Sequence, residues 1–127
     1  MVRTARIAVA TLALVMAALL GSACSSEQSL PGANGEFTQP PYTTGVEIGK
    51  SYSYQLSTHC GIRWARIDGR VWETTPLDDG NANPPDGWSN PYQSGKVVLE
   101  SGESARFEGG GHELRFERSD GEPPGCS

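Results

Sequence analysis

The feature that most constrains the fold is the dipeptide Asp68-Gly69, which joins the runs GIRWARI and RVWETT. An Asp-Gly pair between two strand-like runs is a strong signal for a β-hairpin, because both turn positions tolerate positive φ. A two-residue turn also sets the register of the strands that it joins. The chain is therefore predicted to contain a tight antiparallel hairpin.

The register of this hairpin places its two tryptophans on opposite faces. With a two-residue turn, Ala65 lies opposite Trp72, and Trp64 lies opposite Glu73. Successive side chains along a strand point to opposite faces of a sheet. We therefore expect each face of the hairpin to cover other parts of the domain.

Alternation of apolar and polar residues predicts further strands on both sides of the hairpin. Upstream, residues 51–57 alternate, with two tyrosines and a leucine on one face. Downstream, three strand-like runs are separated by Gly102-Glu103, which favours a turn of type II′, and by the glycines at 109–111. The last run begins at His112, which we expect at the rim of an apolar face.

These segments predict an all-β domain of about six strands. The chain has 16 glycines and 9 prolines, and no long segment repeats its apolar residues at the helical period. Consecutive hairpins favour a small antiparallel sandwich or a partly open barrel. A loop-rich domain of about a hundred residues has a marginal core and gains from a disulfide.

Two cysteines are predicted to form that disulfide. Cys60 follows the first predicted strand, and Cys126 is the next-to-last residue. Two cysteines in an exported domain are usually joined, and this bond would hold the C-terminal tail against the domain. His59 is poorly placed to activate Cys60 as a nucleophile, because neighbouring residues on a strand point to opposite faces.

Residues 76–95 form a long segment of turn residues without a period. Long loops are often functional, and two interpretations compete. The acidic and amide side chains within 78–86 are calcium ligands by type, but Pro84 stands where the EF-hand loop needs glycine. We favour a proline-pinned loop whose Trp88 and Tyr92 pack onto the sheet. If they are exposed instead, they form the candidate binding surface.

The first 23 residues have the order of a secretory signal peptide. Arg3 and Arg6 form a short basic region, residues 7–20 are almost wholly apolar, and small residues lead to Cys24. The apolar run is shorter than the stretch of about 20 residues that spans a bilayer. An ordinary signal peptide cut nearby would leave Cys24 with a free thiol.

The residues before Cys24 resemble the lipobox of bacterial lipoproteins, although Gly21 stands where leucine is usual. The resemblance implies that Cys24 receives a diacylglycerol, which holds an exported protein on the outer face of the cell membrane. The Ser-, Gly- and Pro-rich run that follows is typical of a flexible tether. The predicted organisation is a signal peptide over 1–23, a lipidated cysteine and tether over 24–49, and a β-domain over 50–127.

The segments HCGIRWARIDGRVWE, LDDGNANPPDGWSNPYQSG, RFEGGGHELRF and PPGC resemble a set of small exported proteins of high-GC actinobacteria. The resemblance covers residues 51–126, nearly the whole mature domain. It implies a shared fold unit and an exported location. It implies no activity and transfers no catalytic residue.

Charge and motifs decide between classes of function. The formal net charge of −5 disfavours nucleic acid as a partner. The chain has no Gly-x-Ser-x-Gly, His-Glu-x-x-His or phosphate-binding motif, so we expect neither an enzyme nor a cofactor. The sequence predicts a lipid-anchored, non-catalytic β-domain that binds a protein, a glycan or a small ligand. The alternative is a metal-binding envelope protein that uses His59, His112 and the acidic loop 78–86.

Overall fold

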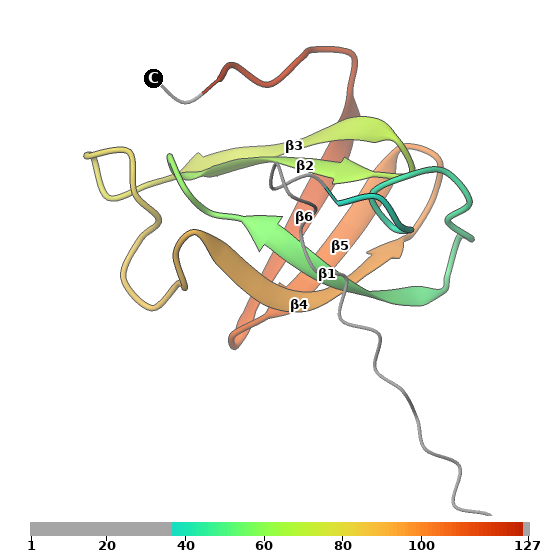
Figure 1. The fold of residues 1–127 in the computed structure, drawn as a ribbon, viewed down its shortest axis with the longest axis horizontal. Helices are drawn as coiled ribbons and strands as arrows, with labels where there is room; N and C mark the ends of the chain where they lie inside the picture. Colours follow the sequence, from blue (N-terminus) through green and yellow to red (C-terminus); the bar gives the residue numbers. More distant parts are fainter. Residues whose placement is uncertain (1–36, 126–127) are drawn as a thin grey trace, which may run out of the picture.

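The computed structural model describes residues 37–125, which form one antiparallel sheet of six strands without a helix (Figure 1). The strands are β1 (Ser51–Ser57), β2 (Ile62–Ile67), β3 (Arg70–Leu77), β4 (Tyr92–Leu99), β5 (Ser104–Gly109) and β6 (His112–Ser119). Their order across the sheet is β1-β4-β5-β6-β3-β2. The all-β class and the six antiparallel strands are therefore confirmed.

The sheet curls into a half-barrel, so the two edge strands β1 and β2 lie near each other across an open seam (Figure 1). The described residues contain one sheet, so of the two predicted architectures the partly open barrel forms and the two-sheet sandwich does not. Curling lets one sheet cover its own apolar face. The seam between β1 and β2 is the place where the barrel stays open.

The hairpin β2–β3 forms as predicted. Both residues of its Asp-Gly turn have positive φ, 55° and 67°. The pairs Ala65–Trp72 and Trp64–Glu73 are confirmed. Trp72 points into the core and is 1% exposed, whereas Trp64 is half-buried on the other face. Both faces of the hairpin are thus covered, but to very different extents.

The folded domain begins before the predicted boundary at residue 50. Tyr42 is 8% exposed and belongs to the core. The turn of the β2–β3 hairpin holds this segment, because Asp68 N–H donates to Pro41 O at 2.6 Å and the Asp68 carboxylate accepts from Gly45 N–H at 2.9 Å. The predicted tether over 24–49 is therefore corrected, since residues 37–49 cover the core at the seam. Residues 24–36 lie outside the described part of the chain.

The long loop is shorter than the predicted 76–95. Its first residues belong to β3 and its last four to β4, so residues 78–91 remain as loop. Pro76 and Gly95 are turn residues by type, so the sequence pattern assigned these strand ends to the loop. Trp88 is half-buried and stacks on His112 with 4.1 Å between ring centroids. This part of the loop packs onto the sheet, as the favoured interpretation predicted.

Of the two turns predicted between β4, β5 and β6, one forms and the other does not. The predicted two-residue turn at Gly102-Glu103 is wrong, because β4 and β5 are joined by four residues in which Gly102 does not take positive φ. The hydroxyl of Ser101 accepts from the Ser104 N–H at 3.0 Å and holds this wider loop. The turn between β5 and β6 forms at Gly110-Gly111, with φ of 60° and 80°.

The core fills the inside of the curl. Its largest fully buried side chains are Trp72, Phe107, Phe116, Leu56, Ile62, Ile67 and Val97. They come from every strand of the sheet, so the core is one continuous cluster. The predicted apolar faces of β1 and β6 point into this cluster.

Two glycines let β4 and β5 approach closely at the curl. A Cβ on Gly95 would lie 2.3 Å from the carbonyl oxygen of Glu108 and 2.6 Å from the Phe107 ring. A Cβ on Gly109 would lie 2.4 Å from the carbonyl oxygen of Ser94. Glycine at such positions is a known means of bending a sheet.

Gly95→Ala is expected to lower the free energy of unfolding by about 1–3 kcal/mol, because the new methyl group forces the backbone of β5 and the Phe107 ring to shift. Gly102→Ala is the matched control, since an added Cβ there meets nothing within 4 Å. It should change stability by less than about 0.5 kcal/mol. Urea denaturation of both variants measures the difference, and equal effects would contradict the close approach.

Candidate functional site: the groove at the seam

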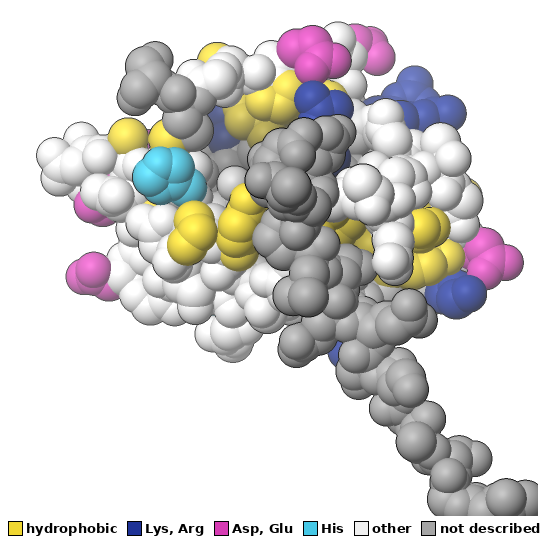
Figure 2. Space-filling model, viewed as in Figure 1, with side chains coloured by type: hydrophobic (Ala, Val, Ile, Leu, Met, Phe, Trp, Pro, Cys, Tyr) yellow, Lys and Arg dark blue, Asp and Glu magenta, His cyan; other side chains and the backbone are white. Residues whose placement is uncertain are grey.

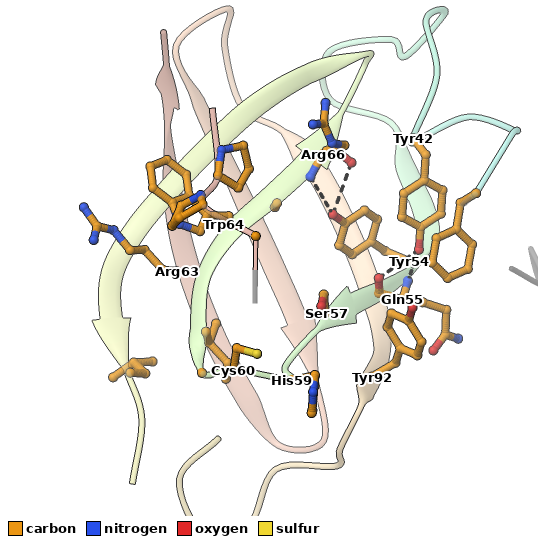
Figure 3. Close-up of a pocket in the computed structure, with 18 of the residues that line it drawn as sticks. Tyr42, Tyr54, Gln55, Ser57, His59, Cys60, Arg63, Trp64, Arg66 and Tyr92 are labelled. Carbon is orange, nitrogen blue, oxygen red and sulfur yellow. Dashed lines mark hydrogen bonds between the residues drawn. The ribbon is translucent and has the colours of Figure 1, made fainter. Parts of the chain in front are cut away.

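A groove of about 1130 Å³ lies along the seam between β1 and β2. Residues from both edge strands, from the segment before β1 and from the C-terminal tail line it (Figure 3). Figure 2 shows hydrophobic side chains along this face, with charged side chains toward its margins. The lining contains the aromatic residues Phe37, Tyr42, Tyr54, Trp64 and Tyr92, the charged residues Arg63, Arg66 and Asp78, and also Gln55, Ser57, His59 and Cys60.

Tyrosine hydroxyls bridge one end of the seam (Figure 3). The Tyr54 hydroxyl, from β1, accepts from Arg66 N–H and donates to Arg66 O in β2, both at 3.1 Å. The Tyr42 hydroxyl donates to Gln55 O at 3.0 Å and accepts from Gln55 N–H. The two rings stack with 4.7 Å between their centroids. Each hydroxyl thus satisfies the backbone of an edge strand where a neighbouring strand would otherwise pair.

Burial raises the pKa of both bridging tyrosines well above the ordinary value. Loss of solvation is the largest cause for Tyr42 and for Tyr54, because the phenolate form is disfavoured in the core. The hydrogen bonds to the backbone of Gln55 and Arg66 oppose this rise only in part. The folded protein therefore keeps both hydroxyls protonated.

The raised pKa values predict that the domain loses stability in alkaline solution. The unfolded chain releases the protons of Tyr42 and Tyr54 near pH 10, whereas the folded protein retains them. The free energy of unfolding should fall above about pH 10, by up to about 1.4 kcal/mol per pH unit for each tyrosine. Below that pH this contribution is constant.

Urea denaturation between about pH 8 and pH 11 tests this dependence. Tyr54→Phe should have a shallower alkaline slope and, near neutral pH, lose about 1–3 kcal/mol because the backbone of Arg66 loses its partner. Tyr92→Phe is the matched control, since its ring also lines the groove. An unchanged slope in Tyr54→Phe would contradict the assigned burial.

The β2 wall of the groove carries two arginines on its exposed side. The Arg63 guanidinium lies 4.9 Å from the centroid of the Trp64 ring and pairs with Glu73 at 2.6 Å. Arg66 pairs with Glu122 at 3.2 Å. Exposed ion pairs of this kind contribute little to stability and exchange readily. Both guanidiniums can therefore turn toward a ligand without a large loss of stability.

The residues that the sequence predicted for binding a ligand or a metal lie in different places in the structure. His59, Cys60 and Tyr92 line the groove, whereas Trp88 and His112 do not. Trp88 packs against Phe107, and the His112 Nε2 atom lies 3.1 Å from the carbonyl oxygen of Gly87. Of the predicted surface, only Tyr92 belongs to the candidate site.

Both predicted covalent modifications involve residues outside the described part of the chain. Cys24 and Cys126 lie beyond residues 37–125, so the lipid anchor and the Cys60–Cys126 disulfide stay predictions. The described chain ends at Gly125, which lines the same groove as Cys60. The tail therefore returns to the side of the domain that carries Cys60.

In the acidic loop, a carboxylate accepts hydrogen bonds from the backbone of the loop itself. The Asp79 carboxylate accepts from the N–H of Asn81 at 2.8 Å and of Asn83 at 3.1 Å. The hydrogen bond from Asn81 is the main reason that the pKa of Asp79 lies below its ordinary value. Across residues 37–125, no three His, Cys, Asp or Glu side chains lie close enough together to hold a metal ion.

Sequence reasoning missed Phe37 and Tyr42 as residues of the site. Both lie in a Pro- and Gly-rich run that resembled a tether, yet their rings stack with 4.1 Å between centroids at the edge of the groove. Two aromatic residues within six positions of a polar run are unusual for a linker. That local enrichment was the available signal.

Comparisons with protein-family models, with curated proteins and with solved structures found no match for this chain. In the described region no helix is long and apolar enough to cross a membrane. A function is therefore inferred from the side chains that line the groove.

Proposed function

We propose that this chain is an exported, lipid-anchored binding protein whose ligand occupies the groove between β1 and β2. The observation that carries the proposal is the size and chemistry of the groove, about 1130 Å³ with both aromatic and polar side chains in its walls. Ligand sites in proteins are usually concave and combine aromatic side chains with polar groups that fix the orientation of the ligand. The long loop, whose Trp88 is packed, offers no comparable surface.

The side chains of the groove suit recognition of a ligand with both apolar and polar parts. Tyr92 and Trp64 are half-buried and line the groove, so part of each side chain lies at the surface. Ser57 and His59 are exposed beside them and add hydrogen-bonding groups. Rigid aromatic residues with nearby polar groups are the usual anchors of binding sites. Since the sequence carries no catalytic motif, we propose binding without chemistry.

The proposed location is the outer face of the cell membrane. Its support is the sequence, where a signal peptide predicted over residues 1–23 precedes Cys24 in a lipobox-like run. The described domain begins at Phe37, so a short segment separates it from the anchor. A ligand of such a domain is a component of the cell envelope or its surroundings.

Photo-crosslinking of the full chain in its host cells tests this proposal. A benzophenone amino acid replaces Ser57, which is exposed at the groove, or Lys96, which is exposed on β4 away from it. We expect a light-dependent adduct at position 57 and none at position 96. Equal labelling of both positions would overturn the groove as the binding site, and labelling of neither would overturn the proposal that a ligand occupies the groove in the cell. The mass of the adduct distinguishes a peptide, a glycan and a small molecule.

A further inference from the structure

We infer that the groove binds a short, extended, acidic peptide that adds as a strand along the edge of β2 at Trp64. This inference deepens the proposed function and rests on it, since it names the ligand class of the same groove. It follows from three observations on the described residues: the direction of the edge backbone groups, the tyrosine bridges, and the charge of the lining.

The first observation is that backbone groups of both edge strands point into the seam. The N–H and C=O of Gln55 in β1 and of Arg66 in β2 face it, because they bond to tyrosine hydroxyls there. Backbone groups along a strand alternate in direction, so residues two positions away face the same side. Two of these residues, Ser57 and Trp64, line the groove.

The second observation is that the tyrosine hydroxyls bond only part of the strand edges that border the groove. Tyr42 and Tyr54 satisfy Gln55 and Arg66, and the described residues provide no hydrogen bond to the seam-facing groups of Trp64. A free strand edge is a template for an added strand, in which main-chain hydrogen bonds supply the affinity. A peptide lying beside Trp64 would continue the pattern that the hydroxyls begin.

The third observation is the sign of the charge at the groove. The chain as a whole has a formal net charge of −5, yet the charged residues of the lining are Arg63 and Arg66 against Asp78. The guanidiniums form exposed ion pairs with Glu73 and Glu122, and that of Arg63 also lies over the Trp64 ring. Arginine binds carboxylates through two parallel hydrogen bonds. Charge complementarity therefore favours a peptide with acidic side chains.

The test begins with selection of displayed random peptides, about eight residues long, on the immobilised full chain. We expect the enriched peptides to be rich in Asp and Glu. An enriched peptide is then synthesised with and without N-methyl groups on alternate amides. Methylation removes the donors that strand addition needs, so affinity should fall about tenfold or more. Equal affinity of the two forms would overturn strand addition.

Arginine variants of the full chain test the charge argument. Arg63→Gln with Arg66→Gln should weaken the selected peptide about tenfold. Arg115→Gln is the matched control, because this arginine is exposed on β6 and does not line the groove. Equal loss in the control would show general attraction by surface charge and overturn the assignment.

The experiments give a different result for each other possible occupant of the groove. If position 57 crosslinks to a glycan or a small molecule and no peptide is enriched, the proposed function stands and this inference fails. If only a chain lacking residues 25–36 binds peptide, the occupant is that segment of the chain itself, and the inference is overturned. If position 57 gives no adduct while an acidic peptide binds with the expected dependence on Arg63, the inference on the groove holds and the proposed physiological role fails.

Discussion

Trp72→Ala is expected to lower the free energy of unfolding by about 3–5 kcal/mol, enough to unfold a marginally stable domain. Trp72 is 1% exposed and is one of the largest side chains of the core. Its Nε1–H also donates to the carbonyl oxygen of Ile67 at 2.9 Å. The substitution therefore leaves a cavity and also leaves a buried carbonyl without its partner, which adds to the cost.

Trp64→Ala is the matched control for this prediction. Trp64 lies on the adjacent strand of the same hairpin, but it is half-buried and faces the groove. Its removal should cost much less stability than that of Trp72, because less apolar area returns to water. Urea denaturation followed by circular dichroism measures both variants. Equal losses would contradict the division of the hairpin into a core face and a groove face.

Cys126→Ser is expected to lower the free energy of unfolding by ~4 kcal/mol if the predicted disulfide to Cys60 is present. The bond would close most of the domain into one loop and thereby restrict the unfolded chain. The described part of the tail, up to Gly125, lines the same groove as Cys60. Denaturation of the variant and of the reduced wild type should show the same loss.

Intact mass with thiol alkylation checks the covalent state behind that prediction. We expect two alkylated thiols, at Cys60 and Cys126, only after reduction, together with a mass raised by lipid on the full chain. Cys24→Ser is the control, because it should remove the lipid and leave the stability of the domain unchanged. Alkylation of Cys60 without reduction would contradict the disulfide.

The strands of this domain were predictable because their signals are local. Alternation of side chains along 51–57 and a two-residue Asp-Gly turn each depend on a few neighbouring residues. The pairs Trp64–Glu73 and Ala65–Trp72 follow from that turn alone. Gly102-Glu103 failed as a turn because Ser101 supplies a side-chain hydrogen bond that the dipeptide pattern does not reveal.

The candidate site was predictable only in part. The sequence nominated Tyr92 and Trp88 together, as aromatic residues of one loop. The structure separates them, because Tyr92 begins β4 beside the groove and Trp88 stacks on His112. The aromatic residues near Phe37 in the sequence argue against a linker, but they do not indicate that Phe37 lies against Tyr42 or lines the same groove as Trp64.

The sequence by itself determined the strands, the central hairpin and its register, because each depends on the two-residue period of a strand and on local turn chemistry. Only the tertiary structure decided that the sheet curls, with β4 and β5 in close approach at Gly95 and Gly109. That curl brings the edges of β1 and β2 within reach of a tyrosine side chain. The groove exists because residues distant in sequence meet there, and the local pattern of apolar and polar residues does not encode which edges will meet.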